Sequence, residues 1–258
     1  MNSVSKKLAL VIGGGDGIGA ACCRVMSNRG WKVAVADLNF KAAQGVASEV
    51  DGNAYEVDVA SLAAVEQLAA DVEAKDGQVY SLVVSSGAFQ NKMAPSEFPM
   101  DLWRKIVSVN LEGTYNANQV FGTLMAERGG GNIVNISSIL AHVSNPNFAY
   151  GPSKAAILNL TRSLAVHWGH RGVRVNSVSP GMVLVPRVLA RPAGRYAADV
   201  DKLSALNRRI EPNEIGESVE FLASDRASAI TGTDLLVDAG LLAATSWGIY
   251  GGKPDGPD

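Results

Sequence analysis

The chain has 258 residues, of which 47% are hydrophobic and 19% are charged, and this composition is typical of a folded globular protein rather than a disordered one. Its formal net charge is −2, so the positive charge that attracts nucleic acids or anionic membranes is missing. No apolar stretch approaches the roughly 20 residues that cross a bilayer. We therefore expect neither a nucleic-acid partner nor a membrane partner, and a chain long enough for one large α/β domain or two small ones.

The predicted elements alternate along the whole chain. Short apolar segments predict strands over 8–13, 32–37, 53–59, 80–86, 131–137, 172–179 and near 234–238. Helical periodicity predicts helices over 17–29, 40–50, 61–75, 101–127, 149–169 and 213–224. Apolar strands separated by helices of this length form a parallel sheet with helices on both faces. Because no linker divides the chain, we expect one doubly wound Rossmann-type α/β domain over 1–258, with about seven strands.

Two segments stand outside this alternation. Residues 182–210 lie between a strand and a helix without a strand of their own, and long insertions at such a place are often lids, so we expect a substrate lid. Residues 241–258 form a C-terminal tail whose end, rich in Gly, Pro and Asp, is expected to be mobile. The sequence leaves open whether Trp247 and Tyr250 of this tail cover a pocket of the same chain or of a neighbour.

The two cysteines, Cys22 and Cys23, are adjacent in the first predicted helix. Neighbouring cysteines rarely form a disulfide, and on a helix they point in different directions. Inert thiols in a reducing compartment are favoured over a redox role, which predicts a cytoplasmic protein.

A glycine-rich loop, GGGDGIG over 13–19, joins the first strand to the first helix. Glycines let the backbone turn sharply and approach a pyrophosphate, whose charge is met by the free N–H groups of the helix start. Such a cluster alone is also typical of a simple turn. Its place between a strand and a helix favours a dinucleotide site.

Asp37 ends the second strand, 24 residues after Gly13, where a carboxylate accepts hydrogen bonds from an adenosine ribose. The same carboxylate repels a 2′-phosphate, and Asp16 adds a second negative charge. The nearest cation is Lys41. We therefore predict NAD rather than NADP as the cofactor, with a mere turn-forming role for Asp37 as the alternative.

In this order and spacing, the motifs resemble the short-chain dehydrogenase/reductase family over about residues 6–240. They are the glycine loop (Gly13, Gly17, Ile18, Gly19), Asp37, Asp58–Val59, the N-L-x-G motif (Asn110, Leu111, Gly113), Ser138, the Y-x-x-x-K pair (Tyr150, Lys154), Pro180–Gly181, and the late signature Ile230-Thr231-Gly232 with Val237, Asp238 and Gly240.

The chain departs from the family pattern at three places. Ile12 replaces the threonine before the first glycine, and Val84-Ser85-Ser86-Gly87 replaces N-N-A-G. Val185 stands where a threonine often binds the nicotinamide carboxamide, so that contact is expected from the backbone of Val183 instead. None of the three changes touches the reacting groups.

The resemblance implies a set of site residues. The cofactor site would comprise Gly13, Gly15, Asp16, Gly17, Ile18, Gly19, Asp37, Asp58, Val59, Ser85, Gly87, Tyr150, Lys154, Pro180, Gly181 and Val183. The catalytic residues would be Asn110, Ser138, Tyr150 and Lys154, with Ser138 and Tyr150 also binding the substrate. No metal is expected.

Each catalytic residue has an expected role. Tyr150 shares a helix face with Lys154, whose cation favours the phenolate and brings the tyrosine, with its ordinary pKa near 10, closer to the operating pH. Ser138 would donate a hydrogen bond to the substrate oxygen. By resemblance, Asn110 would hold a water that links Lys154 to solvent. Ser137 is the alternative to Ser138, because the interval of 12 residues from Ser138 to Tyr150 is slightly short for the family.

Other candidates have weaker support. His167 and His170 lack a third ligand and are expected at a helix end, as surface or capping residues rather than a metal pair. His142 is either a border of the substrate pocket or a plain loop residue. The arginines of the expected lid, Arg187, Arg191 and Arg195, form a solvated helix face or recognise an anionic substrate group.

The sequence thus predicts an NAD-dependent dehydrogenase or ketoreductase of a secondary alcohol. The expected lid is apolar, at Met182, Val183, Leu184, Val185, Val188 and Leu189, which favours a substrate with a substantial apolar part. A dehydrogenase of a cis-dihydrodiol, sugar or polyol is the alternative, and a non-catalytic NAD sensor is less favoured. The resemblance also implies a homotetramer built through 101–127, 149–169 and the last strand.

Overall fold

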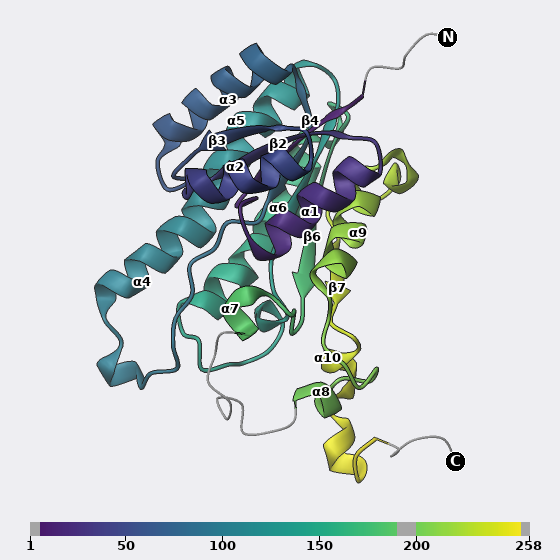
Figure 1. The fold of residues 1–258 in the computed structure, drawn as a ribbon. Coiled ribbons are helices and arrows are strands. Elements are labelled where there is room, and N and C mark those ends of the chain that lie inside the picture. The colour runs from purple at the N-terminus through teal and green to yellow at the C-terminus, as the bar shows by residue number, and fades with distance from the viewer. Residues whose placement is uncertain (1–5, 190–199, 254–258) are drawn as a thin grey trace.

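The centre of the molecule is a sheet of seven parallel strands (Figure 1), and the computed structural model describes residues 6–189 and 200–253. The strands are β1 (Leu8–Ile12), β2 (Lys32–Asp37), β3 (Asn53–Glu56), β4 (Val79–Val84), β5 (Gly131–Ile136), β6 (Val173–Pro180) and β7 (Asp234–Val237). Their order is β3-β2-β1-β4-β5-β6-β7. The order reverses between β1 and β4, and ligands of such sheets bind in the crevice beyond the carboxyl ends of the strands at that point.

Helices cover both faces of the sheet (Figure 1). They are α1 (Gly17–Asn28), α2 (Phe40–Glu49), α3 (Leu62–Asp76), α4 (Met100–Val107), α5 (Gly113–Glu127), α6 (Tyr150–Gly169), α7 (Pro186–Leu189), α8 (Val200–Leu203), α9 (Pro212–Ala223) and α10 (Leu241–Ala244). The core on one face includes side chains of α1, α2 and α9, and the core on the other includes side chains of α3, α5 and α6. The predicted doubly wound α/β fold is confirmed.

The strands are apolar throughout because both faces of the sheet are covered. All five residues of β1 are buried, as are all six of β5. Cys22 and Cys23 are also fully buried on α1, and burial raises the pKa of the Cys22 thiol to about 12. A thiol that stays protonated is a poor nucleophile, which agrees with the predicted inert role.

Two helices differ in detail from the sequence prediction. The helix predicted over 101–127 is α4 and α5 joined by a π-helical turn, Ser108–Glu112. Along α3, Val65, Leu68, Ala69 and Val72 form a buried stripe, whereas Leu62 in the first turn is 37% exposed.

The segment predicted as a lid contains α7, α8 and a parallel bridge between Val183 and Ile210. Figure 1 shows α7, α8 and α10 gathered beyond the carboxyl ends of β6 and β7. Arg191 and Arg195, and the end of the tail that is expected to be mobile, lie outside the described residues.

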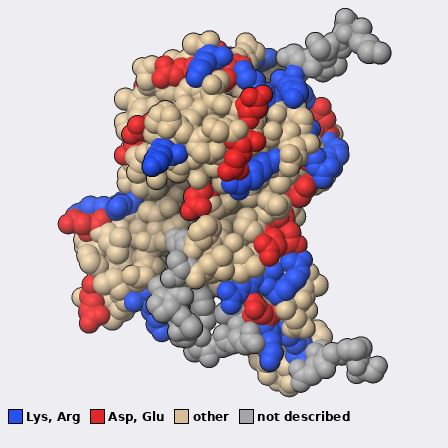
Figure 2. Space-filling view, viewed as in Figure 1, with Lys and Arg blue, Asp and Glu red and all other residues tan. Residues whose placement is uncertain are grey.

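The visible surface in Figure 2 carries both signs of charge, interspersed and without a large patch of either sign. Within residues 6–189 and 200–253, no helix has the length and apolar character needed to cross a membrane. No group of three or more His, Cys, Asp or Glu side chains in those ranges is arranged to hold a metal ion.

Candidate active site

The glycine-rich loop turns directly from β1 into α1. The N–H groups of Gly13 and Gly14 donate to the carbonyl of Ala36 (2.8 and 3.0 Å), which fixes the start of the loop to β2. Gly13 and Gly17 have φ values of +77° and +55°, a region that residues with a side chain rarely adopt. A Cβ atom on Gly19 would overlap the carbonyl oxygen of Gly13. The glycines at these positions are therefore required by the tight turn.

Asp37 holds this loop from the end of β2. Its Oδ2 accepts from the N–H of Gly15 and its Oδ1 from the N–H of Asn39, both at 2.9 Å. Asp16 caps α1, because its Oδ1 accepts from the N–H of Gly17 (2.6 Å). The bare backbone at the start of α1, with a carboxylate beside it at the end of β2, fits the pyrophosphate and ribose of a dinucleotide.

The other cofactor candidates follow the carboxyl ends of neighbouring strands. Asp58 is exposed after β3, while Val59 is buried and packs where a Cβ on Gly113 would lie. Ser85 follows β4, and its N–H donates to the carbonyl of Ile12 (2.8 Å). Because parallel strands end at one edge of the sheet, these residues lie along the same edge as the glycine loop.

The chain after β6 lies close to this edge too. The N–H of Gly181 donates to the carbonyl of Val237 (2.9 Å). The bridge to Ile210 uses the carbonyl of Met182 and the N–H of Leu184, so the N–H of Val183 takes no part in it. A Cβ on Gly17 would lie 3.4 Å from Cγ1 of Val185. The start of the expected lid thus reaches the glycine loop.

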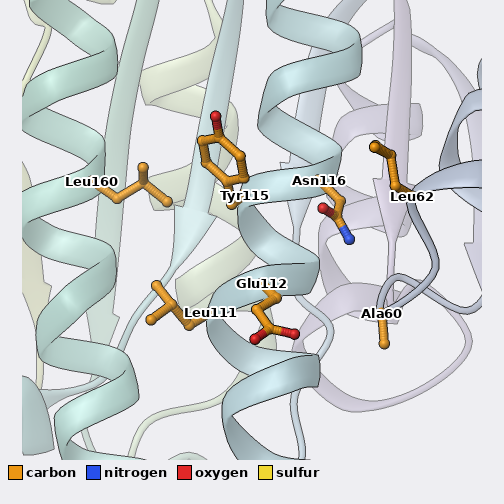
Figure 3. Close-up of a pocket in the computed structure, with 7 residues that line it drawn as sticks. All are labelled: Ala60, Leu62, Leu111, Glu112, Tyr115, Asn116 and Leu160. Atoms are coloured by element: carbon orange, nitrogen blue, oxygen red, sulfur yellow. The ribbon is translucent and has the colours of Figure 1, made fainter.

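A cavity of about 360 Å³ lies at this place, lined by residues of the glycine loop and α1 together with residues of α7 and α9. A second cavity of about 430 Å³ lies between the π-helical turn, α5 and α6 (Figure 3), and none of the catalytic candidates lines it.

Tyr150 and Lys154 occupy the first turns of α6. Lys154 is 3% exposed, and its Nζ lies 5.8 Å from the centre of the Tyr150 ring and donates to the carbonyl of Ile136 (2.8 Å). Burial lowers the pKa of Lys154 to about 8, because the cation loses its hydration there. The lysine is still mostly protonated at neutral pH, so a buried positive charge lies close to the phenol.

The hydroxyl groups of Ser137 and Ser138 have different partners. The Ser137 Oγ donates to the carbonyl of Lys154 (2.9 Å), which ties β5 to α6. The Ser138 Oγ accepts from the N–H of Leu140 (3.2 Å) at the start of a 3-10 turn, Ile139–Ala141. The proton of Ser137 is thus used in the fold, and this contrast favours Ser138 as the residue that faces a substrate.

Asn110 lies in the π-helical turn and is fully buried. Its Oδ1 accepts from the N–H of Ala88 (2.7 Å), and its Nδ2 donates to the carbonyl of Ala88 and to Ser153 Oγ, both at 3.1 Å. The side chain therefore joins the segment after β4 to α6. A π-helical turn inserts one extra residue into the helix, and such turns are frequent at functional sites.

Two residues missed by the sequence analysis adjoin Tyr150. The ring of Phe89 stacks on the ring of Tyr150, with centroids 4.9 Å apart. The Oε1 of Gln90 accepts from the N–H groups of Ala149 (2.9 Å) and Tyr150 (3.1 Å). A signal existed, because Ala149 at the N-cap of α6 has no side-chain acceptor, so the cap had to come from elsewhere.

His142 turns toward the edge of the sheet. Its Nε2 lies 2.9 Å from Oδ2 of Asp234 in β7, and Asp234 also accepts from the hydroxyl groups of Ser177 and Ser179. The loop after Ser138 is therefore tied across β6 to β7. The two alternatives for His142, a border of the substrate pocket or a plain loop residue, both stay predictions.

The other two histidines end α6. His167 contacts the ring of Trp168 edge-on, and His170 is the C-cap residue. Both are exposed, as the sequence predicts.

The chain is similar in sequence to known oxidoreductases. The family model described as "Enoyl-(Acyl carrier protein) reductase" matches residues 13–242. D-threitol dehydrogenase of Mycolicibacterium smegmatis is 37% identical, with 91% of this chain and 92% of that protein aligned. Galactitol 2-dehydrogenase (L-tagatose-forming) of Cereibacter sphaeroides is 36% identical, over 90% of this chain and 93% of that protein.

A solved structure from Brucella melitensis 16M, described as ribose-5-phosphate isomerase, has a TM-score of 0.93 and 42% identity, covering 96% of this chain and 97% of that one. Its description names an isomerase, unlike the family model and the two dehydrogenases. The family model alone covers most of the chain, and the motifs quoted from the sequence agree with it. The chain belongs to the short-chain dehydrogenase/reductase family of oxidoreductases.

Proposed function

We propose that this oxidoreductase is an NAD-dependent dehydrogenase that interconverts a secondary alcohol and its ketone. One observation carries the proposal: a buried lysine cation lies 5.8 Å from the ring of Tyr150, at the sheet edge where the glycine loop and Asp37 form a dinucleotide cradle. NAD, when bound, supplies the acceptor or donor of the hydride. The protein then has to move one proton and align the reacting carbon.

The proton passes through the Tyr150 hydroxyl. In alcohol oxidation the phenolate takes the proton of the substrate hydroxyl, and in ketone reduction the phenol returns it. The charge of Lys154 stabilises the phenolate, and the low polarity around it strengthens that effect. Ser138 donates a hydrogen bond to the substrate oxygen, which stabilises the negative charge that develops there.

Asn110 supports the catalytic residues by fixing Ala88 and Ser153. We propose that it also holds a water that links Lys154 to solvent. The remaining cofactor contacts are proposed at Ile18, Gly87 and Pro180. We propose NAD over NADP because the Asp37 carboxylate, which ends β2 beside the glycine loop, would accept from ribose hydroxyls and would repel a 2′-phosphate.

Two substrate classes are compatible with this chemistry. The apolar side chains at the start of the lid favour a substrate with an apolar part, and Val183 and Val185 are both buried there. The names of the two dehydrogenases, which act on D-threitol and galactitol, favour a polyol instead. A non-catalytic NAD sensor is disfavoured because all four catalytic residues are present.

Assembly and location complete the proposal. We propose a homotetramer in the cytoplasm, with α5, α6 and β7 in the subunit contacts. Tyr115 on α5 and Leu236 on β7 are 45% and 43% exposed, and burial of such side chains favours association.

The test is a spectrophotometric assay of NADH and NADPH formation with secondary alcohols, polyols and cyclic diols, run on the purified wild type and three variants. We expect NADH formation with a preference for NAD of at least tenfold. Tyr150→Phe should lower kcat by about 10³-fold, and Ser138→Ala by about 10²-fold, while both retain NADH fluorescence on binding. Ser137→Ala should leave kcat within a few-fold and lower the stability, because its hydroxyl bonds Lys154.

Several results would contradict the proposal. Full activity of Ser138→Ala would remove Ser138 from the mechanism, and tighter binding of NADPH than NADH would reverse the cofactor assignment. NADH binding without turnover across the panel would favour the sensor. Isomerisation of ribose 5-phosphate without nicotinamide would favour the isomerase named by the solved relative.

A further inference from the structure

Gln90 lies in the segment that follows β4 and is 6% exposed. Its Oε1 accepts two hydrogen bonds from the start of α6, from the N–H groups of Ala149 and Tyr150. Because both groups facing this oxygen are donors, the orientation of the amide is fixed, and a flipped amide would direct N–H groups at N–H groups. The amide nitrogen therefore points away from the helix backbone.

That amide nitrogen, Nε2, is buried, and no acceptor in the described part of the chain bonds to it. A buried donor without a partner destabilises the fold, and few such groups exist in native proteins. The capping of α6 does not require it, because a carboxylate oxygen caps a helix without bringing a donor along. The donor therefore calls for another explanation.

Gln90 and the residue before it both contact Tyr150. Phe89 stacks on the Tyr150 ring, and Oε1 of Gln90 accepts from the Tyr150 backbone N–H. Asn110 fixes Ala88, two residues earlier, through both its amide atoms. The segment from Ala88 to Gln90 is thus tied to the π-helical turn and to the start of α6, and the Gln90 amide is held in one orientation.

We propose that Nε2 of Gln90 donates a hydrogen bond to a second oxygen of the substrate, close to the reacting carbinol, and so selects vicinal diols and polyols over simple secondary alcohols. The inference rests on the proposed dehydrogenase function and names the substrate class of that site. A site built to bond a hydroxyl discriminates strongly against an analogue that lacks it, because the protein donor then stays unpaired. A mono-alcohol leaves the Gln90 donor unpaired and a diol does not, and this difference makes the site selective for the diol.

The test compares 2,3-butanediol with 2-butanol, which share a carbon skeleton and differ by one hydroxyl. Gln90→Glu keeps an oxygen for the N–H groups of Ala149 and Tyr150 and removes the donor. We expect its ratio of kcat/KM for the diol to kcat/KM for the mono-alcohol to fall at least tenfold below that of the wild type. The carboxylate of this variant also offers an acceptor to the second hydroxyl of the diol. Gln90→Met, which offers neither a donor nor an acceptor, is therefore measured beside it, and its ratio should fall by at least the same factor.

Gln78→Glu is the matched control, because Gln78 is exposed between α3 and β4. The control should keep the wild-type ratio. Gln90→Met removes the cap as well, so it should lower Tm in addition to the ratio. A ratio within threefold of the wild type in Gln90→Met, whatever the ratio in Gln90→Glu, would overturn the inference and leave the proposed dehydrogenase function standing.

A second readout does not need turnover. In the presence of NADH, 2,3-butanediol should raise the Tm of the wild type more than 2-butanol at the same concentration, and Gln90→Met should abolish the difference. If the wild type bound NADH and oxidised no alcohol, the proposed function would fail, and this shift would still decide the role of Gln90. Equal shifts by the two alcohols in the wild type would overturn the inference.

Discussion

Lys154 carries its charge where water does not reach it, and this has a cost for stability as well as a use in the proposed mechanism. Burial lowers its pKa to about 8, from an ordinary value of 10.5. Below pH 8 the folded and unfolded chains both hold this proton. Between pH 8 and 10.5 the unfolded chain still holds it while the folded chain has released it, so the free energy of unfolding rises with pH in this window.

The gain from Lys154 over this window should be about 3 kcal/mol, at roughly 1.4 kcal/mol per pKa unit. We expect the cofactor-free wild type to gain stability relative to Lys154→Met as the pH rises from 8 to 10.5. Urea unfolding at a series of pH values measures this difference. The exposed Lys105 on α4 supplies the control, since Lys105→Met should follow the wild type at every pH. Parallel curves for the wild type and Lys154→Met would show that the lysine has an ordinary pKa.

At the level of single residues, the family motifs identified most of the candidate site residues, whereas hydrogen bonds between distant segments were not predicted. Tyr150 and Lys154 are recognisable because they lie one helical turn apart. The glycine loop is recognisable because the tight turn between a strand and a helix fixes the spacing of its glycines. The role of Gln90 depends on the start of α6, about 60 residues further along the chain, and no local pattern contains that information. The sequence also left Ser137 as the alternative to Ser138, because a motif does not contain the hydrogen-bond partners of two neighbouring hydroxyl groups.

Among the elements, α5 and α6 pack unusually closely at one point. Gly122 lies on α5 where the ring of Trp168 on α6 crosses it, and a Cβ on this glycine would overlap the ring. Trp168 is 7% exposed and has little room to move. The glycine thus sets the distance between these two helices.

Gly122→Ala should destabilise the protein by about 1–3 kcal/mol, because the added methyl group overpacks a filled core. Gly45→Ala is the matched substitution: Gly45 lies in α2 with nothing within 4 Å of its Cβ position, so the alanine should stabilise by about 0.5–1 kcal/mol. Thermal unfolding of both variants should move Tm in opposite directions. A Tm for Gly122→Ala at or above that of the wild type would mean that α6 can shift away.

The sequence predicted most element boundaries closely, since strand and helix periods differ and each strand is bounded by turns. Its largest error among the strands is β3, predicted over 53–59 but ending at Glu56. Val57 and Val59 are buried but do not belong to the sheet. An apolar pattern indicates burial rather than strand pairing, so it extended the predicted strand too far. The π-helical turn at Asn110 was not predicted either, because the residues on each side of it keep the periodicity of an α-helix.

At the scale of the whole molecule, two exposed apolar places bear on the proposed assembly. Leu111, Tyr115 and Leu160 line an exposed apolar cavity between the π-helical turn, α5 and α6 (Figure 3). Leu236 lies on β7, which is the last strand of the sheet. The proposed tetramer would cover both places, through two different contacts.

Each contact can be broken separately. Light scattering coupled to gel filtration should give the mass of four chains for the wild type and of two chains for Tyr115→Glu and for Leu236→Glu, because a buried charge opposes each contact. Leu38→Glu, at an exposed position after β2, should leave the mass unchanged. A monomeric wild type would contradict the proposed assembly.

The double role of Asp37 has a consequence for engineering. The carboxylate that we propose to determine the cofactor preference also accepts hydrogen bonds from the N–H groups of Gly15 and Asn39. One side chain therefore both recognises the cofactor and holds the loop. Replacing it with a small apolar residue to admit a 2′-phosphate would also release the loop. A redesign toward NADP therefore needs a neutral acceptor such as serine or asparagine at position 37, combined with a cation on a neighbouring residue such as the exposed Leu38.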